Sequence, residues 1–198
     1  MIVRALVLIS MIAAAPGAAR AADGGVDALL GDGLSVVDSS GTRVDSASLQ
    51  DRWKLVLVGY TSCPDVCPFA LGSLAAAYRE IVAAGERRSV RPPAVLFLSV
   101  DPERDLIDDI SGYVDHFHPD FMAATGDRKA IDRAVRKLGA TYWLNRPDAD
   151  GFYTVDHTAF VHLVSPAGEV KAKLAPPVSA KKLSRVLGRL LPEEGRAG

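Results

Sequence analysis

The two cysteines of this sequence lie four residues apart, at Cys63 and Cys67. A proline follows each of them, and the apolar, β-rich run 54–60 comes directly before the pair. Two thiols at a turn between a strand and a helix have three chemistries open to them: they form a disulfide, they exchange with another disulfide, or they bind a soft metal ion. The type and spacing of these residues are therefore the first indication of function.

The predicted surroundings of the cysteines favour chemistry over a structural role. Proline suits the first turn of a helix, and the residue before it is pushed out of helical geometry. We therefore expect Pro68 to begin a helix and Cys67 to lie at or near its N-cap, where the helix dipole favours a thiolate. Residues four apart in a helical turn have Cα atoms about 6 Å apart, which a disulfide can span. A reversible disulfide is expected, although so small a loop would stabilise the fold little.

The four histidines are the candidates for a third ligand, because two thiolates rarely complete a metal site. A pair of thiolates is a soft ligand set that suits Cu(I) and Zn(II). His116 and His118 lie at the polar end of a predicted helix, and His162 lies within a predicted strand. His157 lies where one predicted strand gives way to the next, and functional residues concentrate at such loop edges. The residues alone favour His157 only weakly.

The N-terminus has the features of an export signal. Arg4 precedes a short apolar segment that Pro16 ends, and a small-x-small cleavage site follows. We expect a signal peptide at 1–21 that is cleaved rather than kept as an anchor, a linker at 22–33, one domain at 34–192 and a tail at 193–198. The expected location is the bacterial periplasm. Cleavage would remove Arg4 and Arg20 and no acid, changing the formal net charge from −1 to −3, which argues against nucleic acid as a partner.

The succession of apolar patterns predicts an α/β sandwich with a central mixed sheet. Near-continuous apolar runs are typical of central strands, and apolar residues at helical spacing predict the helices that cover them. The expected elements, in chain order, are a hairpin at 35–44 with Ser-Ser-Gly as its turn, a strand at 55–60, a helix at 68–84, a strand at 94–100, helices at 106–117 and 128–138, strands at 151–155, 159–165 and 169–174, and a last helix to 191 that Ser179 caps.

Three motifs in this order resemble the Sco/SenC family: Gly59–Pro68, Ser99–Asp105 and Val155–Thr158. These are thioredoxin-like copper proteins that help assemble the dinuclear copper centre of cytochrome c oxidase, and the resemblance extends from about Leu34 to Leu191. It implies a thioredoxin-like fold and copper, as Cu(I) or Cu(II), bound by Cys63, Cys67 and His157. It also implies that the chain is a monomeric metallochaperone rather than an enzyme. The implied partners are the copper-bearing subunit of the oxidase and another periplasmic copper carrier.

Two features of the resemblance need separate mention. Ser62 stands where many members of the family have histidine, which removes one potential ligand or base. The segment Asp101–Asp105 matches a family signature, but the sequence indicates no role for it beyond a turn with an aspartate cap ahead of a helix.

A thiol-disulfide oxidoreductase that reduces the copper-ligand cysteines of its client is the alternative, with Cys63 and Cys67 as the redox pair. Thioredoxin-type enzymes normally use Cys-x-x-Cys and a facing proline. This chain has one more residue between its cysteines, and the segment that resembles the facing loop is Asp-His157-Thr without proline. A peroxidase would need an activated thiolate near an arginine, which nothing specifies. A structural zinc site would need a fourth strong ligand, and none is evident.

Overall fold

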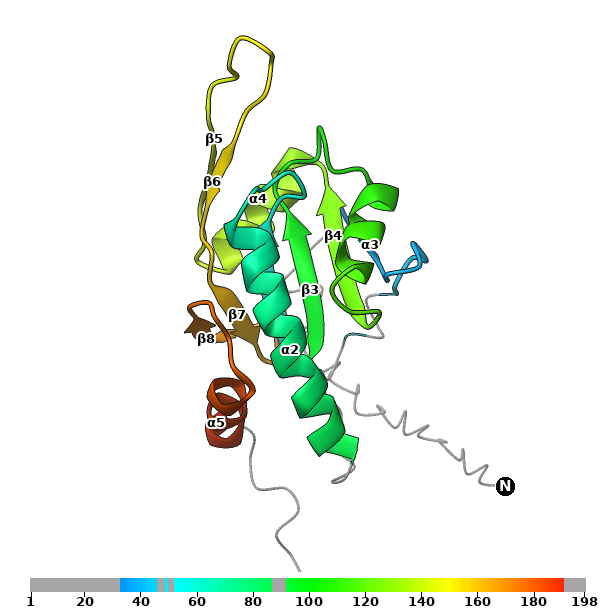
Figure 1. Cartoon of the computed structure of the whole chain (residues 1–198), viewed down its shortest axis with the longest axis vertical. Coiled ribbons are helices and arrows are strands. Elements are labelled where there is room, and N and C mark those ends of the chain that lie inside the picture. Colours follow the sequence, from blue (N-terminus) through cyan, green and yellow to red (C-terminus); the bar gives the residue numbers. More distant parts are fainter. Residues whose placement is uncertain (1–32, 46–48, 50–51, 87–91, 191–198) are drawn as a thin grey trace, which may run out of the picture.

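The computed structural model describes residues 33–45, 49, 52–86 and 92–190 (Figure 1). The predicted signal peptide at 1–21, all of the linker except residue 33, and the tail at 193–198 lie outside the described residues. These boundaries therefore stay predictions.

A six-stranded mixed sheet forms the centre of the molecule, with strand order β1-β4-β3-β2-β7-β8. Strands β2, β3 and β4 run parallel, and the other neighbours are antiparallel. β2 and β3 occupy the middle and are buried at every residue, as their continuous apolar sequences predict. The bounds of the strands are β1 Leu34–Val37, β2 Lys54–Gly59, β3 Ala94–Ser99, β4 Phe121–Gly126, β7 Val161–Val164 and β8 Val170–Leu174.

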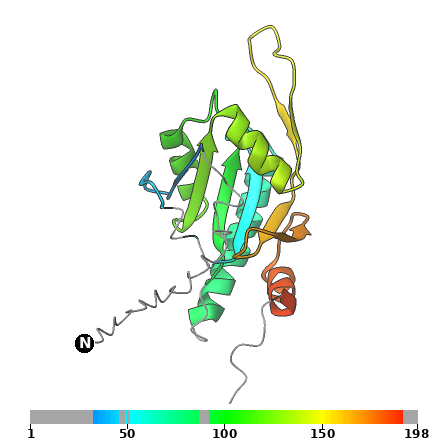
Figure 2. The same ribbon diagram turned by 180° about the vertical axis from the view of Figure 1, so that it is seen from behind.

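Within the described residues, four helices pack around this sheet: α2 (Val66–Glu86), α3 (Ile107–Asp115), α4 (Arg128–Lys137) and α5 (Ala180–Leu190). Helices α2 and α3 cover one face and α4 covers the other, while α5 packs beside α2 (Figures 1 and 2). By length and composition α2 could cross a membrane, but it buries one side in the core through residues such as Leu71, Leu74 and Tyr78. Ser179 caps α5 as predicted, since its hydroxyl accepts the N–H of Lys182 at 3.2 Å.

A second, two-stranded sheet consists of β5 (Tyr142–Leu144) and β6 (Val155–His157). The loop between its strands projects beyond the rest of the molecule (Figure 1). His157 is the last residue of β6 and lies opposite Tyr142. This small sheet carries one of the three predicted ligands, whereas the cysteines follow β2 of the large sheet.

The structure differs from the predicted elements at β4 and in the small sheet. Strand β4 was not predicted, because its sequence contains two alanines and a glycine, whose strand propensity is weak. Its burial in the sheet overrides that propensity. The strand expected at 151–155 lies at Val155–His157, and its partner β5 was not predicted. Gly151 has a φ of +81° and belongs to a turn, in which its N–H donates to the Asp148 carbonyl at 3.1 Å.

The expected hairpin at 35–44 is reduced in the structure. Its turn is present, because the Asp38 N–H donates to the Thr42 carbonyl at 2.9 Å. Its second strand is only a single bridge between Val37 and Arg43. β1 pairs along its length with β4 instead. Because β4 was not predicted, the only partner expected for β1 was the other strand of its own hairpin.

Candidate metal centre

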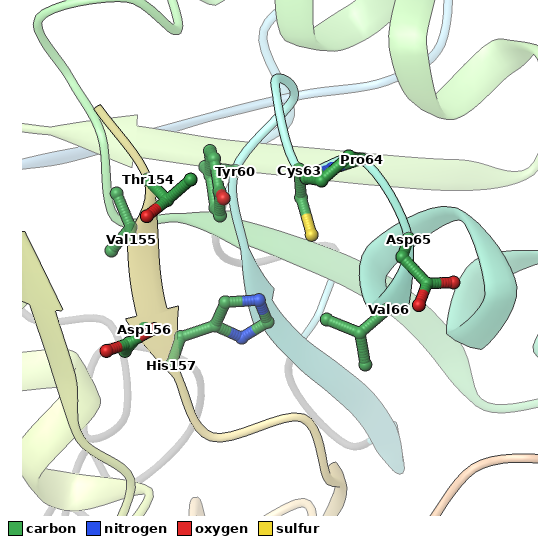
Figure 3. A pocket seen from close by; sticks show the side chains of 9 residues that line it. All are labelled: Tyr60, Cys63, Pro64, Asp65, Val66, Thr154, Val155, Asp156 and His157. Carbon is green, nitrogen blue, oxygen red and sulfur yellow. The ribbon is translucent and has the colours of Figure 1, made fainter. Parts of the chain in front are cut away.

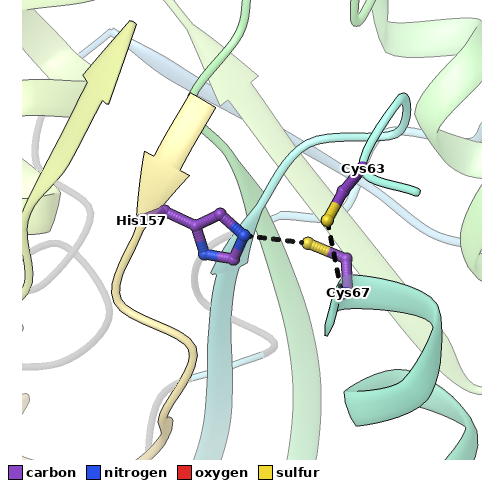
Figure 4. Close-up of side chains that lie close together, drawn as sticks. All are labelled: Cys63, Cys67 and His157. Carbon is purple, nitrogen blue, oxygen red and sulfur yellow. Dashed lines mark hydrogen bonds between the residues drawn. The ribbon is translucent and has the colours of Figure 1, made fainter. Parts of the chain in front are cut away.

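Cys63, Cys67 and His157 meet at the end of β2 where the chain enters α2 (Figure 4). Their sulfur and imidazole nitrogen atoms all lie within 4.8 Å of one another, and the Cys67 Sγ is 3.2 Å from the His157 Nε2. This is the one group of three or more cysteine, histidine and acidic side chains found in the described part of the chain that could hold a metal ion. The structure therefore brings together the three residues that the sequence singles out.

The other histidines lie elsewhere. His116 follows α3 as its C-cap residue, and the His118 ring contacts Tyr78, with ring centroids 4.9 Å apart. His162 is buried within β7, where its Nδ1 lies 3.3 Å from the Val56 carbonyl oxygen. None of these imidazoles belongs to the cluster.

The cysteine loop differs in one detail from the prediction. α2 begins at Val66, two residues before Pro68, so Cys67 lies inside the first helical turn rather than at the N-cap. The proline is still tolerated, because N–H groups of the first turn have no partner within the helix. The Cys67 N–H instead points to the Cys63 sulfur at 3.5 Å. The Cys67 N–H in the first turn of the helix thus donates to the sulfur of Cys63.

The expectation that the helix terminus favours a Cys67 thiolate is wrong for the copper-free protein. Cys67 is fully buried, and desolvation raises the pKa of its thiol well above the usual range, with the neighbouring Cys63 adding to the shift. Burial thus outweighs the helix dipole here. Both cysteines are free thiols in this structure, and the expected disulfide remains a prediction. A bound cation would supply the charge that makes deprotonation of Cys67 favourable.

The surroundings of His157 leave one of its nitrogens free for a ligand. Its Nδ1 lies 3.3 Å from the Thr158 carbonyl oxygen, which can only accept, so Nδ1 carries the hydrogen. In the neutral ring the Nε2 lone pair then points to the Cys67 sulfur. Burial lowers the pKa of His157, which favours this neutral form. The Tyr60 ring packs edge-on against the imidazole, with centroids 5.9 Å apart.

An open cleft gives access to the cluster (Figure 3). Cys63 and His157 line it, whereas Cys67 lies beneath them with no exposed surface. The full lining consists of Tyr60, Cys63, Pro64, Asp65, Val66, Thr154, Val155, Asp156 and His157. The sequence did not indicate Tyr60 as a site residue, although its polar hydroxyl at the end of an apolar strand was a usable signal.

Known proteins share this arrangement of elements. The family model described as SCO1/SenC matches residues 25–191. This chain belongs to the SCO1/SenC family. The mitochondrial SCO1 homologue of Homo sapiens is 36% identical over 141 residues, which cover 71% of this chain and 46% of that protein. The chain thus spans less than half the length of this relative.

Solved structures of family members agree with the fold. The Arabidopsis thaliana ScoI crystal structure with copper bound is 31% identical, with a TM-score of 0.66, and the match covers 81% of this chain and 96% of that one. Bradyrhizobium japonicum ScoI with copper bound is 28% identical, with a TM-score of 0.67 and coverages of 80% and 98%. The predicted thioredoxin-like α/β fold is confirmed.

Proposed function

We propose that this chain binds one copper ion through Cys63, Cys67 and His157 and delivers it to the copper-bearing subunit of cytochrome c oxidase. The observation that carries the proposal is the meeting of two sulfurs and one imidazole nitrogen within 4.8 Å. Copper-bound relatives with the same fold support the choice of metal. The role in oxidase assembly comes from the family resemblance.

The chemistry of the donor set fits copper. Two thiolates are soft ligands that suit Cu(I), and a neutral imidazole makes Cu(II) acceptable as well. A closed structural zinc site would require four ligands, and this cluster offers three. Cys63 and His157 face an open cleft, so a partner's ligands can reach the ion. A centre of three ligands at a cleft suits a protein that must release its metal.

Anaerobic titration with Cu(I) against a competing chelator tests the proposal. We expect one ion per chain in the reduced protein and loss of binding in Cys63→Ser and Cys67→Ser. His157→Ala should weaken Cu(II) more than Cu(I), because two thiolates alone can hold Cu(I). His116→Ala is the matched control, since that imidazole lies outside the cluster. Stoichiometry near zero, or stoichiometry that the serine variants leave unchanged, would reject copper binding.

The second candidate function is reduction of a disulfide between the client's copper-ligand cysteines. The different exposure of the two thiols favours it: Cys63 is 8% exposed at the cleft and Cys67 is fully buried. In such a reaction the Cys63 thiolate attacks the client disulfide. The Cys67 thiolate then attacks the Cys63 sulfur of the mixed disulfide and displaces the client thiolate, which leaves two reduced client cysteines and a Cys63–Cys67 disulfide.

A His157→Ala strain separates the two functions. A reductase has no need of a metal-binding imidazole, so full oxidase activity in this strain at low copper would favour thiol reduction. The copper carrier predicts poor assembly that external copper partly restores, because abundant metal bypasses the carrier. Added dithiol, rather than copper, would restore assembly if the chain were only a reductase.

We also propose that the protein acts in the periplasm as a monomer after cleavage of residues 1–21. The support for the location and the cleavage is the signal-like N-terminal sequence. Mass spectrometry of the protein from a periplasmic extract should give a chain that starts at residue 22. A full-length chain in the membrane fraction would show an uncleaved anchor.

A further inference from the structure

The segment Asp101–Asp105 lies between the two parts of the candidate metal centre. It follows β3, and β2 and β3 run parallel, so both the segment and the cysteine loop start from the same edge of the sheet. The Asp101 and Asp105 side chains are buried, at 0% and 1% exposure. Buried carboxylates are costly unless hydrogen bonds satisfy them. Their partners therefore show what the segment does.

Asp105 holds the loop that carries the cysteines. Its Oδ2 accepts the Thr61 N–H at 3.0 Å, and its Oδ1 accepts the Thr61 hydroxyl at 2.5 Å. Ser99, the last residue of β3, donates its hydroxyl to Oδ2 at 2.5 Å. Thr61 lies two residues before Cys63. The carboxylate thus fixes the start of the cysteine loop to the end of β3.

Asp101 and Arg104 hold the segment that leads into β6. The Tyr153 hydroxyl donates to the Asp101 Oδ1 at 2.6 Å, and the Arg104 Nε donates to the Oδ2 of the same carboxylate at 2.5 Å. The Arg104 Nη1 donates to the Tyr153 carbonyl at 2.9 Å, and its guanidinium lies 3.7 Å from the centre of the Tyr153 ring. Tyr153 is held at its hydroxyl, its ring and its backbone, four residues before His157.

We propose that Asp101–Asp105 is a bracket that positions His157 against the two cysteines. One side of the bracket, Asp105, holds the cysteine loop through Thr61. The other side, Asp101 with Arg104, holds β6 through Tyr153. Neither side contacts the sulfurs or the imidazole in any hydrogen bond of the described residues, so these are positioning residues. The proposal rests on the proposed copper function only for its metal-based measurements.

The two sides of the bracket predict different effects on copper. Loosening β6 moves the imidazole and leaves the thiolates in place, so it weakens Cu(II) binding far more than Cu(I) binding. Loosening the cysteine loop moves a thiolate and weakens both ions. Partners that orient metal ligands are typically worth 10- to 100-fold in metal affinity. A merely structural role would instead lower stability without separating the two oxidation states.

Tyr153→Phe is the first test, because it removes the hydroxyl bonded to Asp101 and keeps the ring beside Arg104. Its matched control is Tyr113→Phe, which removes a buried tyrosine hydroxyl that has no hydrogen-bond partner among the described residues. In the copper-free protein, Tyr153→Phe should speed amide hydrogen exchange at 155–158, and the control should not. With copper, Tyr153→Phe should weaken Cu(II) binding about tenfold and shift the thiolate-to-Cu(II) absorption band. Its affinity for Cu(I) should change less than threefold.

Two further variants make the test independent of any one substitution. Arg104→Lys keeps the charge but loses the two-sided hydrogen bonding of the guanidinium, and it should reproduce the Tyr153→Phe pattern. Thr61→Val removes the hydroxyl bonded to Asp105 and should weaken Cu(I) and Cu(II) together. Urea unfolding of each variant shows whether the fold is retained.

Hydrogen exchange in the copper-free protein separates failure of the bracket from failure of copper binding. If wild type bound no copper, the proposed function would fail, but faster exchange at 155–158 in both β6-side variants would still support the bracket. If Tyr153→Phe and Arg104→Lys exchanged these amides no faster than Tyr113→Phe does, the bracket would be overturned, even if the protein binds copper. Equal weakening of Cu(I) and Cu(II) by Tyr153→Phe would overturn it as well.

Discussion

The six-stranded sheet and the small β5–β6 sheet supply the candidate metal centre by different physical means. β2, which leads to the cysteines, is buried along its whole length between helices. β5 leaves Trp143 70% exposed, and β6, which carries His157, has one buried residue. Apolar packing of β2, together with the Asp105 carboxylate, fixes the cysteine side of the centre, whereas the histidine side depends mainly on a few polar contacts. The two sides should therefore respond differently to substitution.

The largest difference is expected in global stability. Phe97→Ala in β3 should lower the free energy of unfolding by about 3–5 kcal/mol, because the ring is fully buried in the core. Trp143→Ala in β5 removes a larger side chain, but that side chain is mostly exposed. The free energy of unfolding should therefore change by less than about 0.5 kcal/mol. Urea unfolding of both variants makes the comparison. Similar losses would mean that the small sheet is part of the same cooperative core.

A second contrast concerns the close packing beneath the cysteines. A Cβ on Gly59, at the end of β2, would lie 2.6 Å from the Cys67 sulfur and 2.7 Å from the Phe97 ring. Gly59→Ala should therefore cost about 1–3 kcal/mol of stability and weaken Cu(I) binding by displacing the sulfur. Gly72→Ala in α2 is the matched control. It meets nothing within 4 Å and should stabilise the helix by about 0.5–1 kcal/mol.

The sequence predicted the part of the molecule that apolar packing determines. The runs at β2 and β3 and the periodicity of α4 and α5 indicate their elements directly. The cysteines could be chosen from their spacing and their place after an apolar strand, whereas the residues alone favoured His157 only weakly and the resemblance to the Sco/SenC family singled it out. β5 was missed because it is short and mostly exposed, so its sequence has no buried face to mark it.

Contacts between distant segments could not be predicted in the same way. Nothing local shows that Asp101 will accept a hydrogen bond from Tyr153, 52 residues away, or that Asp105 will bind Thr61, 44 residues away. The pKa of Cys67 was also misjudged for this reason. A helix terminus is visible in the sequence, but the burial that opposes it exists only in the folded chain.

One of the buried polar side chains of the large sheet is a histidine, and it gives a smaller and pH-dependent effect. His162 is fully buried in β7 and its Nε2 has no hydrogen-bond partner among the described residues; Lys173 lies opposite it on β8. Burial lowers the pKa of His162, with the Lys173 charge acting in the same direction and the hydrogen bond to Val56 opposing it. Folding thus favours the neutral ring, and its contribution to stability is lost as the pH falls below 6.5 toward the lowered pKa.

Urea midpoints at about pH 7.5 and about pH 5.5 measure this effect. Wild type should lose stability at the lower pH, and His162→Leu should lose less. His118 and His157 also have lowered pKa values, so some loss will remain in the variant. Equal losses in the two proteins would show that His162 titrates alike in the folded and unfolded chains.

The smallest effect on overall stability is expected at the tip of the small sheet. The Asp148 Oδ1 accepts the N–H groups of Asp150 at 3.0 Å and Phe152 at 2.9 Å, which closes the turn. Asp148→Ala should change the free energy of unfolding by less than about 0.5 kcal/mol, since the loop projects away from the core. Amide exchange near 150–152 should nevertheless become faster. A large loss of global stability would contradict the division between the two sheets.

The sequence separation within the centre has a consequence for folding. Cys67 and His157 are 90 residues apart, and they meet only after β2 has paired with β7. Such long-range pairing is slow compared with formation of α2, because loop-closure entropy must be overcome first. During synthesis, both thiols are made and exposed well before His157 has been added to the chain. The three-ligand centre therefore appears late and all at once, as a product of complete folding rather than a nucleus for it.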